Sequence, residues 1–409
     1  MERFQQSHFF QNPTSSVLQV GRLEEALNEK GYRTAIIATG PALKKFDERK
    51  LKIDLSFNVE GLDEEDSIDL AKNIANHCKE AFCVITDAAH PFDPLLQEQL
   101  KRKNIVTLAG YDNPEPYVPG GYSEVAAKVM KLADGVLFSN ANLSNEEIFE
   151  APSQLIELPK EKRYGIGYYP LAQAEKLIHK RSSAYAANTK QQILEKFPGV
   201  NTVCVYFGGN NSVYFHEAFP AFLRIIEETS SDIDLSDMVI LVQQHPGAAK
   251  ENRDGLAMTA LSKNPKMPKF GLSTLSTEDA QSIADVALYY QTSMGPLFAL
   301  AGIPTMQIGH ETFSDILVKN HLAPSVTTSE ELINAIVDHK TGTYTINKAL
   351  LYEKLGIRKN CKDLLEQAIL NTKASAEKET SFSLSTKMLT AGALLTIGFI
   401  AFRYLRHKQ

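Results

Sequence analysis

Several common signatures are missing from this 409-residue sequence, and each absence argues against a class of protein. The chain has four cysteines, and they form neither a CxxC pair nor a zinc-ligand spacing with histidine, so the usual zinc and redox motifs are excluded. Cys83 and Cys204 lie in apolar, strand-like runs, so we expect buried thiols and a reducing compartment. The formal charge of −6 provides no broad basic field, so no nucleic-acid partner is indicated.

Long apolar runs are also rare. Residues 1–11 are polar and lack the apolar centre of a signal peptide. The exception is residues 388–405, where the first 15 positions carry no charge and basic residues flank the run. At about 1.5 Å per residue this run is short for a bilayer, although Lys and Arg side chains can reach out to the membrane surfaces. We predict a single C-terminal transmembrane anchor, with a helix packed on the protein body as the alternative.

This prediction has two consequences for the rest of the chain. Residues 373–387 are polar and rich in serine, as expected of a tether that joins the body to an anchor. Because no export signal precedes the anchor, the catalytic body is expected to remain in the cytosol.

Apolar segments of strand length alternate with helical segments in two series. Strands are expected at residues 34–39, 53–59, 82–86, 105–109 and 135–139, and again at 202–206, 238–243, 270–272, 286–290 and 305–308. Strands separated by helices pair in parallel through right-handed crossovers. We therefore predict an α/β protein with two doubly wound, Rossmann-like domains facing a cleft, residues 1–160 and 161–372. Few residues precede the first helix, so the first strand of the first domain is either very short or missing.

Three strands of the second domain end in segments suited to a ligand. They are followed by Gly208, Gly209 and Asn210, by His245, and by Ser293, Met294 and Gly295. Ligands meet doubly wound sheets at the carboxyl ends of the strands, glycine lets the backbone approach them closely, and a helix that opens there presents N–H groups to phosphate. These segments predict a phosphate or nucleotide site. A plain turn and a strand-terminal histidine bonded to backbone are the alternatives.

The order of these segments resembles the nucleotide-binding domain of GT-B glycosyltransferases. His245-Pro246, Ser293 and the stretch 298–304 (FALAGIP) are similar to CDP-glycerol glycerophosphotransferases and bacterial sialyltransferases, and the layout of residues 200–320 also resembles UDP-N-acetylglucosamine 2-epimerases. The resemblance implies further donor contacts from His310 and Glu311, which follow the last of these strands. Leu297 is a departure, because many members carry an acidic residue there that contacts the donor ribose.

The first domain supplies candidates for the acceptor side. Asp87 and His90 follow a strand, where either could act as the general base; a helix-capping Asp and a solvent-facing His are the alternative. Asp112, Asn113 and Tyr117 lie in a loop rich in Tyr, Pro and Gly and are candidate acceptor contacts. A rigid turn packed on the hinge is the alternative for this loop.

The resemblance implies a transferase that moves a sugar or polyol phosphate from a nucleotide-activated donor to an acceptor that the sequence does not identify. It also implies that helix N-termini and side chains stabilise the leaving phosphate without a metal or cofactor. In agreement, the two aspartates of Asp232-Ile233-Asp234 lie in a polar connection before a strand rather than in a loop that could bind a metal ion. A nucleotide-sugar 2-epimerase and an inactive, membrane-tethered binding module are the alternatives, and Leu297 favours the second of these.

Overall fold

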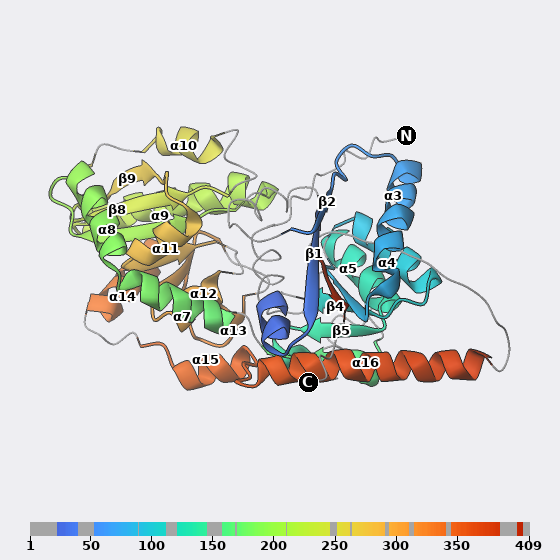
Figure 1. The fold of residues 1–409 in the computed structure, drawn as a ribbon. Coiled ribbons are helices and arrows are strands. Elements are labelled where there is room, and N and C mark those ends of the chain that lie inside the picture. The colour runs from blue at the N-terminus through green and yellow to red at the C-terminus, as the bar shows by residue number, and fades with distance from the viewer. Residues whose placement is uncertain are drawn as a thin grey trace. The chain divides into compact units, whose positions relative to one another are not determined.

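The chain forms two α/β units in the computed structural model, drawn in Figure 1 with colours from blue to red along the sequence. The structure describes residues 23–39, 53–88, 90–111, 121–144, 158–167, 170–209, 211–245, 252–261, 264–290, 294–310, 315–340, 345–384 and 399–403. Unit 1 comprises Met1–Tyr169 and Leu355–Gln409, and unit 2 comprises Pro170–Lys354. The first division lies between Tyr169 and Pro170, whereas the predicted boundary lies between residues 160 and 161. In contrast to the predicted domains, the chain returns to unit 1 at Leu355.

Unit 1 is built on a sheet with the strand order β2-β1-β13-β3-β4-β5-β6. The strands are β1 (Arg33–Thr39), β2 (Leu55–Phe57), β3 (Cys83–Thr86), β4 (Thr107–Tyr111), β5 (Gly135–Phe138), β6 (Arg163–Gly165) and β13 (Phe399–Arg403). All pairs are parallel except those of β13, which runs antiparallel to both β1 and β3. The five strands predicted for this domain are found within a few residues of their predicted bounds, because continuous apolar runs form strands buried on both faces.

The predicted C-terminal helix differs from the structure. Within residues 388–405 only Phe399–Arg403 are described, and they form strand β13 between β1 and β3. That central position is the one that the first strand of a doubly wound domain normally takes. Within the part of the chain that the structure describes, no helix is both long and apolar enough to cross a membrane.

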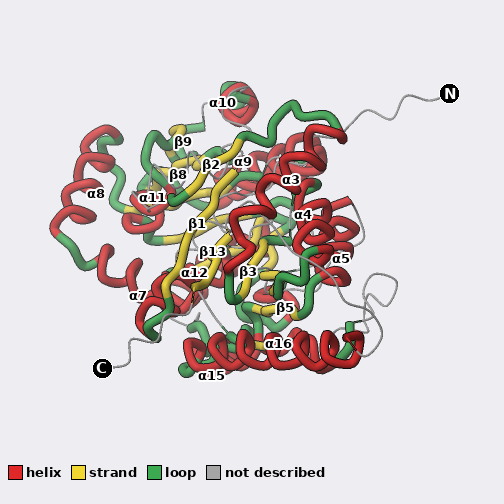
Figure 2. Tube along the Cα trace, turned by 45° about the vertical axis from the view of Figure 1, so that its right-hand side comes forward, coloured by secondary structure: helices red, strands yellow, loops and turns green. Residues whose placement is uncertain are grey.

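Helices cover both faces of the unit 1 sheet. Figure 2 shows α3 (Glu64–His77), α4 (Phe92–Arg102) and α5 (Gly121–Leu132) side by side, and apolar clusters join them to the strands. Ala109 and Val136 point toward α5, whereas the preceding Leu108 and Gly135 lie against Thr372 of α16 (Cys361–Leu384). Because neighbouring residues of a strand face opposite sides, α16 covers the face away from α5. The other described helical segments of this unit are short. They are residues 23–29 and three 3₁₀ turns, Cys78–Glu80, Ala141–Ser144 and Lys160–Lys162.

The predicted tether is helical as far as Leu384, because α16 continues through it. Its first half is held by burial of Leu365, Ala368 and Ile369. An ion pair between Lys30 and Asp363 joins α16 to the segment before β1.

Unit 2 has an all-parallel sheet of strand order β12-β11-β10-β7-β8-β9. The strands are β7 (Thr202–Phe207), β8 (Met238–Gln243), β9 (Lys269–Leu272), β10 (Val286–Tyr289), β11 (Thr305–Ile308) and β12 (Ser325–Val326). The chain starts in the centre at β7, proceeds to one edge, and then crosses back to β10 on the other side of β7. This strand order is that of a doubly wound sheet, with its switch point between β7 and β10.

Two sets of helices sandwich this sheet. Tyr206 stacks on Phe222 of α9 (Phe219–Asp232) with ring centroids 4.1 Å apart, while the next residue, Phe207, contacts Phe298 of α12 (Gly295–Leu300) at 4.7 Å. The α9 face also holds the five-residue π-helix Tyr214–Ala218 and the helices α10 (Arg253–Met258) and α14 (Ser329–Lys340). The α12 face holds α7 (Pro170–Arg181), α8 (Ala184–Lys196) and α11 (Thr277–Ile283). The short helices α13 (Ile316–Lys319) and α15 (Lys348–Lys354) contact α12.

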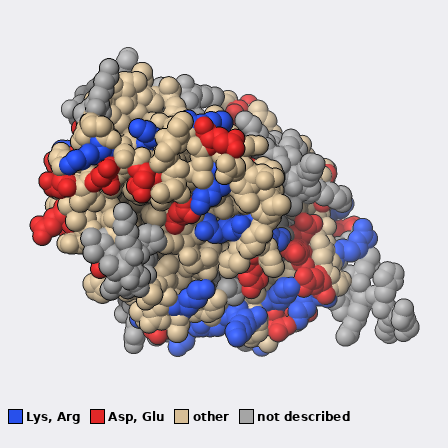
Figure 3. Space-filling model, turned by 90° about the vertical axis from the view of Figure 1, so that its left-hand side faces the viewer, with Lys and Arg blue, Asp and Glu red and all other residues tan. Residues whose placement is uncertain are grey.

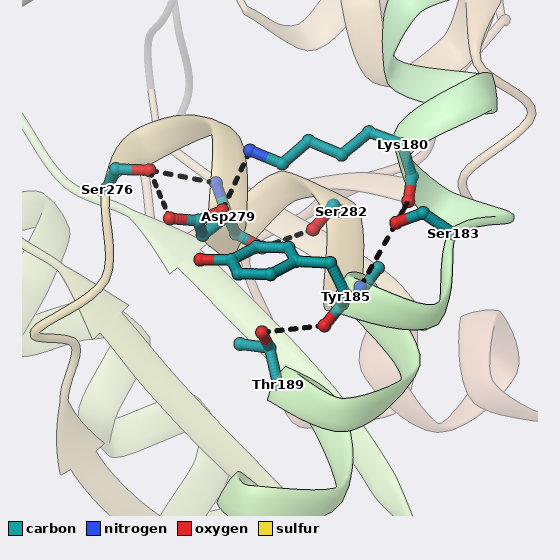
Figure 4. A network of polar contacts seen from close by, with 8 residues as sticks. Lys180, Ser183, Tyr185, Thr189, Ser276, Asp279 and Ser282 are labelled. Carbon is teal, nitrogen blue, oxygen red and sulfur yellow. Dashed lines mark hydrogen bonds and ion pairs between the residues drawn. The ribbon is translucent and has the colours of Figure 1, made fainter.

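A polar network fastens α7 and α8 to α11 (Figure 4). Lys180 pairs with Asp279 at 2.7 Å, and its ammonium group lies 5.8 Å from the centre of the Tyr185 ring. Ser183 and Ser276 are the N-caps of α8 and α11, where each hydroxyl accepts a backbone N–H of the first turn. The network therefore holds helices together and carries no sign of a ligand site.

The expectation for the cysteines is met: all four are free thiols, and Cys83 and Cys204 are buried as predicted. The face shown in Figure 3 carries both basic and acidic side chains, with several Lys and Arg near its lower edge.

Candidate functional site

The turn after β7 lies at the switch point of the unit 2 sheet. A Cβ on Gly208 would stand 2.5 Å from Tyr214 Oη, and one on Gly209 would stand 3.0 Å from the Tyr214 ring. Both positions therefore require glycine for packing on Tyr214, whatever ligand the turn binds. Backbone at this turn is close to solvent, since both glycines are half-buried. The predicted neighbour Asn210 lies outside the described residues.

His245 follows β8, next to the β7 turn in the sheet. Burial lowers the pKa of its imidazole to about 4, so the ring is neutral at neutral pH. A neutral imidazole has one N–H donor and one acceptor nitrogen. His245 therefore offers a phosphate a hydrogen bond rather than a positive charge.

Beneath the Gly208–Gly209 turn lies a group of buried polar side chains, which we call the Asp254 cluster: Tyr206, Tyr214, Gln244 and Asp254. Asp254 is 0% exposed, and its Oδ2 would lie 3.4 Å from a Cβ on Gly208. Burial raises the pKa of Asp254 to about 6, and the Tyr214 hydroxyl and Gln244 amide lie near enough to oppose this rise. Neither carboxyl oxygen, however, reaches hydrogen-bonding geometry with another described residue.

The other members of the Asp254 cluster share this property. The hydroxyls of Tyr206 and Tyr214 and the Nε2 of Gln244 are buried and have no hydrogen-bond partner within the described part of the chain. Burial raises the pKa of both tyrosines, so both stay neutral. An interior group of this kind costs stability, and such groups concentrate at functional sites.

A second polar group lies on the other side of β10. His310, which follows β11, contacts Glu217 of the π-helix with an Nε2–Oε2 distance of 3.3 Å. Gly309 makes this contact possible, because its φ is +112° and a side chain there would overlap the Ala218 carbonyl. Tyr290 lies between the two groups, with its ring 6.2 Å from that of Tyr214 and 6.5 Å from that of His310. Single-turn π-helices are frequent at functional sites, which draws attention to Glu217.

The helix after β10 is shorter and more buried than expected. α12 has six residues, all buried, and Gly295 packs against the Tyr289 ring. Tyr289 in turn donates its hydroxyl to Asp315 at 2.8 Å. Leu297 is 8% exposed and belongs to the core, so this position has a packing role in the chain. Met294 begins the helix as its N-cap, and the predicted Ser293 lies outside the described residues.

In unit 1, His90 and Asp93 form the start of α4. His90 Nδ1 accepts the N–H of Phe92 at 3.2 Å, and the Asp93 carboxylate accepts the N–H of His90 at 2.6 Å. This reciprocal arrangement resembles a capping box and lies at the start of α4, whose N-cap position is Pro91. Burial lowers the pKa of His90, so the ring is neutral, and since Nδ1 is an acceptor the proton must lie on Nε2.

This geometry changes the role that His90 can take. A neutral ring with its acceptor nitrogen committed to a helix cap cannot receive a proton there, but Nε2–H remains a hydrogen-bond donor. Asp87, directly after β3, is 7% exposed and accepts the N–H of Ala88 at 2.8 Å. Of the two predicted bases, Asp87 is the one whose chemistry suits proton removal.

Other polar side chains lie around the same strand ends. Gln97 of α4 donates to the Thr86 hydroxyl at 2.5 Å, and both side chains are buried. The Gln97 Oε1 and the hydroxyl of Thr39, at the end of β1, have no hydrogen-bond partner among the described residues.

The sequence reasoning missed most of these polar residues. Asp254, Glu217 and Gln97 lie on helices, where a polar residue usually marks a solvated face. The fold buries Asp254 and Gln97, whereas Glu217 stays exposed beside His310. One signal in the sequence points to them: the glycine pair at 208–209 follows a strand, so side chains that pack beneath this turn lie at the switch point.

Several predicted site residues lie outside the described residues: Asn210, Ser293 and Glu311 on the donor side, and Asp112, Asn113 and Tyr117 on the acceptor side. Those that are described lie at two strand edges, Asp87 and His90 in unit 1, and Gly208, Gly209, His245, Met294, Gly295 and His310 in unit 2. Among the residues that the structure describes, no group of three or more His, Cys, Asp or Glu side chains could hold a metal ion.

Two Rossmann-like units joined in one chain define the GT-B class of fold, and comparison with solved structures agrees. UDP-GlcNAc 2-epimerase from Neisseria meningitidis, solved with UDP-GlcNAc, matches with a TM-score of 0.62 and 10% identity over 91% of this chain and 98% of that one. MnaA of S. aureus, solved with UDP, matches with a TM-score of 0.60 and 10% identity, over 92% of this chain and 97% of that one. The UDP-GlcNAc 2-epimerase of Methanocaldococcus jannaschii matches with a TM-score of 0.59 and 13% identity, over 78% of this chain and 89% of that one.

No family model and no curated protein matches this sequence. The structural likeness therefore concerns the fold. It confirms the predicted resemblance to UDP-N-acetylglucosamine 2-epimerases, and it extends from residues 200–320 to most of the chain.

Proposed function

We propose that the protein is an enzyme that acts on a nucleotide-activated sugar or polyol, and that unit 2 binds the phosphates of this substrate. One observation carries the proposal: the switch point of the unit 2 sheet lies between β7 and β10, and the predicted ligand segments follow these two strands. Gly208 and Gly209 would offer backbone, Met294 and Gly295 would offer N–H groups, and His245 would donate a neutral hydrogen bond. The known structures of the same fold named above were solved with UDP-GlcNAc and with UDP, which supports this class of ligand.

For the reaction, we propose transfer of the sugar or polyol phosphate to an acceptor hydroxyl, without a metal or cofactor. Asp87 would remove the proton of the hydroxyl, and His90 Nε2–H would donate a hydrogen bond to the reacting oxygen or its neighbour. This division follows from the His90 cap geometry, and an orienting donor beside a carboxylate base is an established way to promote proton transfer.

A 2-epimerase reaction is the second candidate, and the acidic residues Glu217 and Asp254 of unit 2 support it. Epimerisation at C2 needs one group to remove a proton from carbon and another to return it. Glu217, paired with His310 at the carboxyl edge of unit 2, meets the first requirement, and Asp254 lies beneath the neighbouring turn.

These candidates are separated by incubating the protein with UDP-GlcNAc or CDP-glycerol in D₂O and recording NMR spectra. A transferase releases the nucleotide only when acceptor is present and leaves the C2 proton of the sugar in place. An epimerase introduces deuterium at C2, and Glu217→Gln should abolish this exchange. Saturable binding without either reaction would indicate the inactive binding module, and no binding of any nucleotide would refute the proposal.

As the alternative to the placement of Phe399–Arg403 in strand β13, we also propose that residues 388–405 anchor the protein in a membrane with its body in the cytosol. This rests on the charge-free run and its basic flanks.

A further inference from the structure

The Asp254 carboxyl is the unit 2 group that the proposed transfer chemistry leaves without a use. Its side chain is completely buried, and both oxygens lack a hydrogen bond within the described part of the chain. An unpaired carboxylate in an apolar interior is among the most unfavourable groups a protein can hold. A protonated carboxyl in the same place is far less costly, because it carries no charge.

The surroundings of Asp254 lead to the Gly208–Gly209 turn. Asp254 Oδ2 and Tyr214 Oη both lie directly behind Gly208, at 3.4 Å and 2.5 Å from the position of a Cβ. The backbone N–H of Gly209 lies near enough to the Tyr214 hydroxyl to lower its pKa, and the hydroxyl in turn acts on Asp254. Tyr214 therefore connects the turn to the carboxyl.

Few groups close to Asp254 could take up a proton in its place. Tyr206 on β7 and Tyr214 on the π-helix act electrostatically on Asp254, and Arg253 precedes it on its own helix. His245 follows Gln244, which also acts on Asp254, and Tyr290 after β10 acts on Tyr206. The three tyrosines have raised pKa values and remain neutral, and His245 is neutral above about pH 5 because burial lowers its pKa to about 4. The Arg253 guanidinium lies over the Phe215 ring, 4.8 Å from its centre.

Building on the proposed function, we propose that Asp254 takes up one proton from solvent when the diphosphate of a nucleotide-activated ligand occupies the Gly208–Gly209 turn. Negative charge in the turn disfavours a carboxylate behind it, and little water intervenes to screen the repulsion. Protonation forms one O–H bond on Asp254, and the carboxyl changes from an acceptor into a donor toward the Tyr214 hydroxyl. The proton returns to solvent when the ligand leaves.

The test is calorimetric titration of the full chain with UDP-GlcNAc and with CDP-glycerol from pH 5.5 to 8.5. Both ligands are diphosphate diesters, which lack the monoester ionisation near pH 6 that would obscure the result. Repeating each titration in two buffers of different ionisation enthalpy gives the number of protons taken up. We expect up to one proton per ligand near pH 7, and an affinity that falls roughly 10- to 100-fold from pH 6 to pH 8.

Two variants show which residue takes up the proton. Asp254→Asn resembles the protonated carboxyl in shape and charge, so it should bind with an affinity that no longer depends on pH and with no proton uptake. His216→Gln changes an exposed histidine of the π-helix that lies outside the predicted site, and it should retain the uptake. Uptake that persists in Asp254→Asn, uptake lost in His216→Gln, or pH-independent binding by the unaltered chain would overturn the proposal while the proposed function stands. No binding at any pH would overturn both.

Discussion

At the scale of single residues, the candidate sites contain polar groups whose tasks are set by burial and by their hydrogen bonds. His90 is the clearest case, because one nitrogen serves the helix cap and leaves only a donor for chemistry. His245 is likewise neutral, so in the proposed site it would donate a hydrogen bond to phosphate rather than contribute a charge. Both histidines were found from their position after a strand, but neither the protonation state nor the tautomer can be deduced from sequence.

The double role of His90 can be separated by substitution. Asparagine is a good N-cap, so His90→Asn should keep the stability within about 0.5 kcal/mol, whereas His90→Ala should lose about 1 kcal/mol. Both variants lack Nε2–H, so both should lose turnover to a similar extent. Urea unfolding and the transfer assay measure the two effects. Full activity in His90→Asn would show that the histidine is only a cap.

Asp254 predicts an unusual dependence of stability on pH. A carboxyl with a raised folded pKa contributes stability that is fully present below its unfolded pKa and is lost as pH rises through the folded value, here from about 4 to about 6. Asp254→Asn does not undergo this loss. Relative to the unaltered chain, the variant should therefore gain on the order of 2 kcal/mol between pH 4 and pH 7.5. Thermal unfolding at both pH values tests this, and an unchanged difference between the two proteins would contradict it.

At the scale of elements, the strands could be predicted well and their surroundings less well. Met238–Gln243 and Thr305–Ile308 were predicted to the residue, because parallel strands buried on both faces read as continuous apolar runs. The π-helix at Tyr214–Ala218 could not be predicted, since its spacing differs from an α-helix only through tertiary packing. The buried polar residues behind the turns could not be found for the same reason.

The junction of β11 with the π-helix gives an element-scale prediction. Gly309→Ala places a Cβ against the Ala218 carbonyl and also strains a positive φ, so we expect a loss of about 2–4 kcal/mol. Gly302→Ala is the matched control, because Gly302 has a φ of +72° but no atom within 4 Å of the new Cβ. The control should lose about 1 kcal/mol. Equal losses in urea unfolding would mean that the packing at Ala218 contributes nothing.

At the scale of the whole molecule, the two-unit α/β fold could be predicted from the rhythm of strands and helices, and the resemblance in residues 200–320 pointed to the right fold class. The course of the C-terminal part of the chain could not be predicted from the sequence. Residues 373–384 are polar enough to suggest a tether, yet they continue a helix whose first half is buried on unit 1. The apolar run after it is equally suited to a bilayer and to the centre of a sheet, because both environments select the same residue types.

Deletion of residues 385–409 tests these two placements of the tail. If the run is a membrane anchor, the shortened protein should move from the membrane fraction to the soluble fraction with unit 1 as stable as before. If Phe399–Arg403 form the central strand, the deletion should lower the melting temperature of unit 1 strongly, because β1 and β3 lose the strand that joins them. Fractionation and calorimetry on the same two proteins decide between the outcomes.

The central claim is that the unit 2 switch point binds a nucleotide through its phosphates. The most direct measurement is a titration of the full chain with UDP, CDP, GDP and CMP, followed by calorimetry and by melting temperature. We predict saturable binding of at least one of them, with a higher melting temperature. His245→Ala together with Ser293→Ala should remove both signals, while Asp279→Asn, in the network of Figure 4, should keep them. No binding by any of the four, or binding that survives the double substitution unchanged, would contradict the claim.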